Sequence, residues 1–102
     1  MITYKVVTND MKSLGLRKNP TILKYSRNKW KCISDDELRF NNNDEGGIWV
    51  CKNLSGATKL RKYMKQKYNK LVRIFISEID VVLYENSYRI KTNAVKLLLE
   101  IK

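Results

Sequence analysis

The sequence predicts one α+β domain over residues 1–102, built from a mostly antiparallel sheet and one main helix at residues 55–68. Segments rich in β-branched and aromatic residues recur along the chain, and turn-forming residues separate them. Only residues 55–68 combine helical spacing of apolar residues with a capping signal. A length of 102 residues argues for one domain, and 43% hydrophobic residues suffice for a folded core.

Strand-like segments begin the chain. Residues 2–7 join β-branched and aromatic side chains and stop at Thr-Asn-Asp. Residues 8–20 are expected to form a loop, and residues 22–25 and 29–33 are weaker strand candidates. If residues 29–33 form an edge strand, alternation turns Trp30 toward the core and its flanking lysines toward solvent.

The helix follows a polar loop and a short strand. Residues 34–47 hold three asparagines in a row, five acids and two glycines, and are expected to form a surface loop. Residues 48–51 then form a short strand. The helix is capped by Asn53 or Ser55 and ends at Asn69. Its apolar stripe consists of Ala57, Leu60, Tyr63, Met64 and Tyr68.

Further strands fill the second half. Residues 72–79 form a strand, and residues 81–84 continue it or pair with it. Residues 88–91 form another. The tail at residues 95–101 fits a strand or a helical turn, and its shortness favours a strand.

The chain is strongly basic, with a net charge of +11 and a pI of about 9.8. Such a charge favours nucleic acid, anionic lipid headgroups or an acidic protein surface as a partner. No acid occurs between Glu45 and Glu78, although opposite charges four residues apart usually support a helix. The alternative is a solvated helix face in a lysine-rich protein.

Aromatic residues are interleaved with these cations, as they are in proteins that stack bases and pair phosphates of single strands. The alternative for Trp49 and Tyr63 is core packing. The candidate residues for binding nucleic acid or an acidic partner are Lys59, Arg61, Lys62, Lys65, Arg73, Lys29 and Lys31.

Catalytic groups are sparse. Histidine is absent, and the best candidate for a working carboxylate is Glu85, whose alternative role is a hairpin residue paired with Arg89 or Lys91. Cys32 and Cys51 match no metal-binding spacing, so no metal is expected. Whether they pair is open, and Cys51, just before a helix, could have a lowered pKa.

Three stretches carry a family resemblance: the opening strand TYKVV, then GIWV leading through Leu-Ser into the helix, then RIFISEI leading to Leu-Tyr-Glu. This order resembles small ADP-ribosyltransferase-like domains of bacteria and phages, and is similar to small proteins of low-GC bacteria and their phages. The resemblance implies a catalytic role for Glu85 and a nicotinamide dinucleotide held near Lys5 and Arg89. Lys5 stands where the family has Arg or His, and the Ser-Thr-Ser element is absent at residues 47–50. The resemblance therefore implies a scaffold that binds without chemistry.

The leading hypothesis is a small non-enzymatic binding protein that engages nucleic acid or an acidic surface of a nucleic-acid-handling protein. An inhibitor encoded by a phage or mobile element fits the size and charge. No cofactor is expected. No apolar run reaches membrane-span length and the N-terminus has no signal-peptide pattern, so a cytoplasmic location is expected. The alternatives are a minimal ADP-ribosyltransferase-like enzyme or dinucleotide binder using Glu85, and a homo-oligomeric interaction module.

Overall fold

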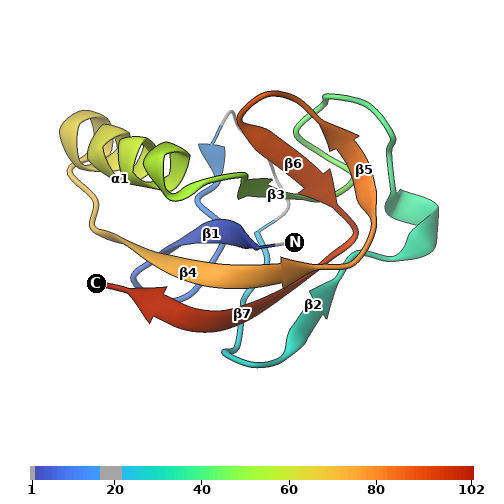
Figure 1. Cartoon of the computed structure of the whole chain (residues 1–102), viewed down its shortest axis with the longest axis horizontal. Helices are drawn as coiled ribbons and strands as arrows, with labels where there is room; N and C mark the ends of the chain where they lie inside the picture. Colours follow the sequence, from blue (N-terminus) through green and yellow to red (C-terminus); the bar gives the residue numbers. More distant parts are fainter. Residues whose placement is uncertain (1, 17–21) are drawn as a thin grey trace.

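The computed structural model describes residues 2–16 and 22–102 and confirms the α+β class. Within these residues one α-helix lies against a seven-stranded antiparallel sheet of order β2-β7-β4-β1-β3-β6-β5 (Figure 1). The elements are β1 (Thr3–Thr8), β2 (Trp30–Cys32), a 3-10 turn η2 (Asp35–Glu37), β3 (Ile48–Cys51), α1 (Leu54–Tyr68), β4 (Val72–Ile79), β5 (Val82–Glu85), β6 (Arg89–Thr92) and β7 (Ala94–Ile101).

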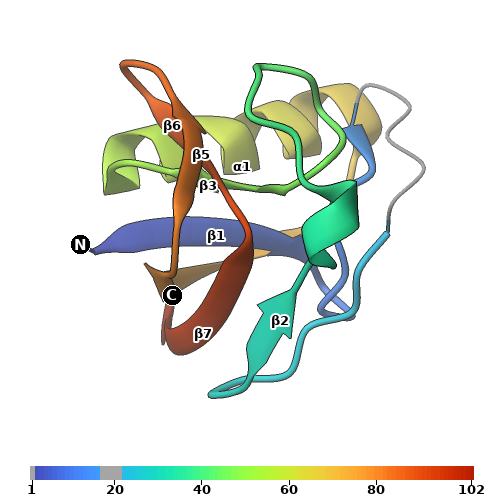
Figure 2. The same ribbon diagram turned by 90° about the vertical axis from the view of Figure 1, so that its right-hand side faces the viewer.

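The two faces of the sheet carry different cores. On the helix side, Val6 and Ile74 pack against Ala57 of α1. On the other side, a larger cluster includes Val7 and Phe75, because successive residues of a strand point to opposite faces. Both views place α1 on one side of the molecule and β2 on the opposite side (Figures 1 and 2).

The helix begins and ends where the sequence predicts. The Asn53 side chain accepts a hydrogen bond from the Gly56 N–H at 2.8 Å, and Asn69 ends the helix in the left-handed conformation with φ of 52°. The predicted apolar stripe is only partly right. Tyr63 and Tyr68 lie exposed, because only a narrow stripe around Met64 can face the sheet. Their rings instead lie 5.5 and 5.8 Å from the Lys67 ammonium.

One strand prediction is wrong, and a second is right in only one of its two forms. Residues 22–25 make only an isolated bridge between Lys24 and Lys12, although the side chain of Tyr25 is buried. β5 does not pair with β4; it carries the chain on after a bend at Asp80 and Val81, and it pairs with β6 as β4 pairs with β7. The Asn93 side chain holds this bend, accepting from the Val81 N–H at 2.8 Å and donating to the Asp80 carboxylate at 3.0 Å.

The prediction for Trp30 is also wrong. β2 lies at the edge of the sheet, where Trp30 pairs with Lys96 of β7, and the tryptophan is 46% exposed. At this edge of the sheet, the Trp30 side chain lies beside Lys96 and outside the core. Cys32, on the same strand, is an exposed free thiol, while Cys51 on β3 is a half-buried free thiol.

We expect Asn53→Ala to lower the free energy of unfolding by about 1 kcal/mol, because the substitution leaves the Gly56 N–H without its cap. Urea denaturation would measure the change. Thr58→Ala is the control, since its hydroxyl bonds the Leu54 carbonyl within the helix and alanine has the better helix propensity. An equal loss in both variants would contradict the capping role.

Candidate functional site

The sheet is split between β1 and β3. These neighbours pair only at Tyr4↔Cys51, whereas β1 pairs with β4 at six positions. Buried backbone groups need hydrogen-bond partners, and Lys5 supplies one. Its Nζ donates to the Trp49 carbonyl at 2.8 Å, so a side-chain amine replaces a rung of the ladder.

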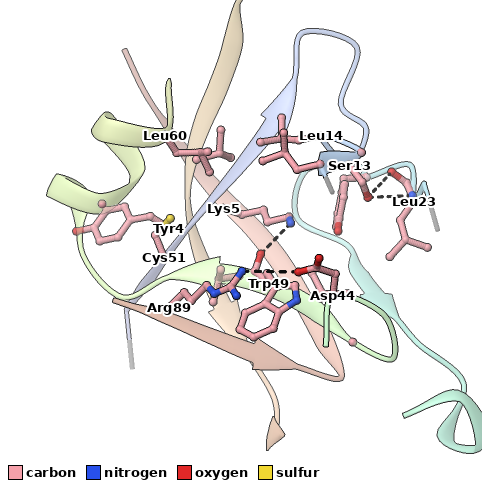
Figure 3. Close-up of a pocket in the computed structure, with 18 of the residues that line it drawn as sticks. Tyr4, Lys5, Ser13, Leu14, Leu23, Asp44, Trp49, Cys51, Leu60 and Arg89 are labelled. Atoms are coloured by element: carbon pink, nitrogen blue, oxygen red, sulfur yellow. Dashed lines mark hydrogen bonds and ion pairs between the residues drawn. The ribbon is translucent and has the colours of Figure 1, made fainter. Parts of the chain in front are cut away.

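A cavity of about 280 Å³ lies at this split (Figure 3). Tyr4 and Lys5 both line it although neighbours on a strand point to opposite faces, so the cavity reaches residues of both faces. Its walls come from β1, β3, the start of α1, β6 and the loop after β1. The lining residues used below are Lys5, Tyr25, Asp44, Trp49, Cys51, Gly56, Leu60, Tyr88 and Arg89.

Lys5 is the most unusual of these residues, since it is charged and only 8% exposed. Burial lowers the pKa of its amine to about 8, and the nearby Cys51 thiol partly offsets that effect. Lys5 Nζ also lies 5.5 Å from the centre of the Tyr25 ring. The amine still carries a proton in most molecules at pH 7.

Arg89 provides a second cation. Its guanidinium carbon lies 3.8 Å from the centre of the Trp49 ring, which is stacking distance. Asp44 approaches the same guanidinium, with 3.9 Å between Oδ1 and Nη1. Arg89 Nε and Trp49 Nε1 are buried donors without a hydrogen-bond acceptor. The cations of Lys5 and Arg89 thus meet at one residue, Trp49, beside two unsatisfied donors.

Burial also shifts the pKa values of two other residues that line the cavity, Cys51 and Tyr25. The pKa of Cys51 is raised, because desolvation outweighs the attraction of Lys5 and Arg89. The predicted lowering of this pKa by the helix N-terminus is therefore wrong. Burial likewise raises the pKa of Tyr25 to about 12, with Ser13 opposing the shift.

The predicted basic residues of α1 do not form one row. Gly56 and Leu60 line the cavity, and Tyr63 and Lys67 follow at intervals of three or four residues, so these four share a flank of the helix. Lys59, next to Leu60, lies beside this flank and is exposed. The other predicted residues, Arg61, Lys62 and Lys65, lie toward the opposite flank.

The remaining predicted binding residues lie elsewhere. Arg73 is held by Glu100 through two hydrogen bonds, of 2.8 Å from Nη2 and 3.2 Å from Nε. Lys29 and Lys31 lie just before and within β2, on the side of the molecule opposite α1 (Figures 1 and 2). Lys29 and Lys31 therefore do not share one basic face with α1.

The structure separates the three residues implied by the family resemblance. Lys5 and Arg89 line the cavity, whereas Glu85 is not among its lining residues. The Glu85 carboxylate lies 2.6 Å from Lys52 Nζ, so its partner is neither Arg89 nor Lys91.

The sequence pattern does not reveal the roles of Trp49, Asp44 and Tyr25 at this site. These residues are far apart in the chain, and their approach depends on strand order. One signal was present: Lys5 interrupts the opening strand at a position whose alternate neighbours, Thr3 and Val7, are buried. A lysine at an inward position of a strand is a candidate functional cation.

Comparison with protein-family models, curated proteins and solved structures finds no match to this chain. Among the described residues, no group of three or more His, Cys, Asp or Glu side chains is placed to hold a metal ion. No helix in this part of the chain is long and apolar enough to cross a membrane.

We expect Lys5→Met to remove a pH dependence of stability. The folded amine has a pKa of about 8 and the usual pKa of a lysine is 10.5, so between these values the unfolded chain binds more protons. The stability of the natural protein relative to the variant should therefore rise from pH 8 to pH 10.5, by up to roughly 3 kcal/mol. Chemical denaturation across this range would measure the difference. Lys62→Met, at an exposed site, is the control, and equal slopes for Lys5→Met and the natural protein would contradict the burial of a charged amine.

Proposed function

We propose that this protein binds single-stranded nucleic acid without catalysing a reaction, along the flank of α1 next to the cavity. The observation that carries this proposal is a set of two exposed cations and one exposed aromatic ring on or beside that flank: Lys59, Tyr63 and Lys67, here called the α1 row. Tyr68 lies beside the row, with its ring centre 6.0 Å from that of Tyr63.

The chemistry of the α1 row suits a single strand. Exposed aromatic rings stack on bases in a sequence-tolerant way, and neighbouring cations neutralise phosphates. Lys67 lies over the rings of Tyr63 and Tyr68, so one cation and two aromatic faces are presented together. An acidic protein surface would also attract the lysines, but its carboxylates do not stack on exposed aromatic rings as bases do.

The α1 row has no acid on its own helix, since the chain has none between Glu45 and Glu78. Arg73, by contrast, forms an ion pair with Glu100. Like charges three residues apart on a helix, such as Lys59 and Lys62, repel one another by a few tenths of a kcal/mol per pair. An external polyanion relieves this repulsion, which supports phosphate as the partner.

A second candidate function is the binding of a dinucleotide in the cavity. The observation that favours it is that Lys5 and Arg89, the residues implied by the family resemblance, line the same cavity. The ion pair of Glu85 with Lys52, outside the cavity lining, favours binding over transfer of ADP-ribose.

We expect the double variant Lys59→Gln/Lys67→Gln to weaken binding of a single-stranded homopolymer. Two lost phosphate contacts should reduce the slope of log affinity against log salt by about 1.4. Fluorescence anisotropy at several salt concentrations would measure the slope. The matched control is Lys29→Gln/Lys31→Gln, which lowers the net charge equally but on the β2 side.

Equal slopes in the two double variants would show that net charge alone drives binding and would contradict the role of the α1 row. Capture of an acidic protein, with no affinity for nucleic acid, would favour the alternative partner.

For the second candidate, nicotinamide dinucleotide should raise the thermal stability of the natural protein and leave that of Lys5→Met unchanged. A ligand at one hundred times its dissociation constant adds about 2.7 kcal/mol to the free energy of unfolding. Differential scanning fluorimetry would record the shift. Absence of any shift at millimolar dinucleotide would remove this candidate.

A further inference from the structure

We propose that the cavity at the split between β1 and β3 receives the phosphorylated end of a nucleic acid strand, while the adjoining nucleotides lie along the α1 row. This inference rests on the proposed function and deepens it, because it names the part of the strand that the protein recognises. The ligand chemistry is a terminal phosphomonoester with the nucleotide that bears it.

The donors of the cavity point to an oxyanion. Lys5 Nζ and the Arg89 guanidinium are cations, and Arg89 Nε and Trp49 Nε1 are buried donors that lack acceptors. Indole and guanidinium nitrogens donate hydrogen bonds and accept none. A group that completes this site must therefore supply acceptors and negative charge, and a phosphate monoester supplies three strong acceptor oxygens.

The charge balance favours a strand end over an internal position. Lys5 and Arg89 bring two positive charges to Trp49, and Asp44 offsets one of them from 3.9 Å. A terminal phosphomonoester carries about 1.5 to 2 negative charges at pH 7, whereas an internal phosphodiester carries one. The terminal group therefore competes better with Asp44 for the Arg89 guanidinium.

The size of the cavity also favours a strand end over an internal position. Its volume of about 280 Å³ lies just below the range of roughly 300–1,000 Å³ usual for small-molecule pockets. A single small ligand fits this volume, and a continuous strand does not. An internal nucleotide would need exits for the chain on both sides, whereas an end needs only one.

The α1 row supplies the continuation. Leu60 lines the cavity, and Tyr63 is the next residue along the same flank, followed by Lys67 one turn further. Tyr88, another lining residue, is 54% exposed and lies 5.7 Å from the Arg89 guanidinium. Figure 3 shows Lys5 between Leu60 and the pair of Trp49 and Arg89. A nucleotide held in the cavity is thus followed by an aromatic ring and a cation at the spacing of a helix turn.

The test compares one single-stranded sequence in four forms: with a 5′-phosphate, with a 3′-phosphate, with hydroxyl groups at both ends, and circularised. We expect one linear phosphorylated form to bind about tenfold more tightly than the hydroxyl-ended and circular forms, the effect of a few charge-assisted hydrogen bonds. The preferred form identifies which end enters the cavity. Anisotropy with the natural protein gives this result without any substitution.

Substitutions then test which residues recognise the terminal phosphate. Lys5→Met and Arg89→Gln should each remove the preference for the phosphorylated form, so that this form binds no more tightly than the circular form. Asp44→Asn should increase the preference severalfold, because the guanidinium loses its competing carboxylate. Lys29→Gln/Lys31→Gln is the control and should retain the preference.

The results distinguish failure of this inference from failure of the proposed function. Equal affinity for all four forms would overturn recognition of an end and leave strand binding by the α1 row intact. No affinity for any form would overturn the proposed function itself. A preference that survives both Lys5→Met and Arg89→Gln would show that the phosphate is recognised outside the cavity and would overturn this inference.

Discussion

The hydrogen bond from the Lys5 ammonium to the Trp49 carbonyl is the contact on which the site depends. It lets β1 and β3 remain neighbours in one sheet while pairing at a single position. A cation is costly to bury, and the lowering of the Lys5 pKa to about 8 records that cost. An aliphatic side chain would avoid the cost but would leave the carbonyl without this donor. The incomplete pairing of β1 and β3, the cavity between them and the buried charge of Lys5 therefore occur together at one place in the sheet.

The helix and the cavity are linked by helix geometry. Because residues three and four apart share a flank, the residues of α1 that line the cavity are continued by Tyr63 and Lys67. The lysines of the last turn also interact favourably with the negative end of the helix dipole. This explains how a helix without acids remains stable, and it leaves the cations near its C-terminus available to a polyanion.

Local patterns in the sequence were enough to predict the main helix, a cap at Asn53 or Ser55 and the strands at β1, β3, β4 and β7, because period and capping act over a few residues. They could not predict which strands pair. The position of Trp30 depends on β2 being the edge strand, and the place of β5 beside β6 depends on the bend after β4 that the Asn93 side chain holds. Periodicity gives the faces of an element and not its neighbours.

The site was less predictable than the fold for the same reason. Lys5 and Arg89 were candidates from the family resemblance, and their approach to Trp49 is visible only once β1, β3 and β6 are assembled. Along the sequence, all cations of α1 look equivalent. In space they divide between two flanks, Arg73 is engaged by Glu100, and Lys29 and Lys31 lie near the far edge of the sheet.

The most direct test of this account is an NMR titration of the Lys5 side chain, through its ε-carbon, with and without a mononucleotide that carries a terminal phosphate. We expect a pKa of about 8 in the protein alone. The pKa should rise when the nucleotide is added, because a nearby anion stabilises the charged amine. A pKa close to the usual lysine value of 10.5, unchanged by the nucleotide, would contradict both the burial of Lys5 and its role in holding a phosphate.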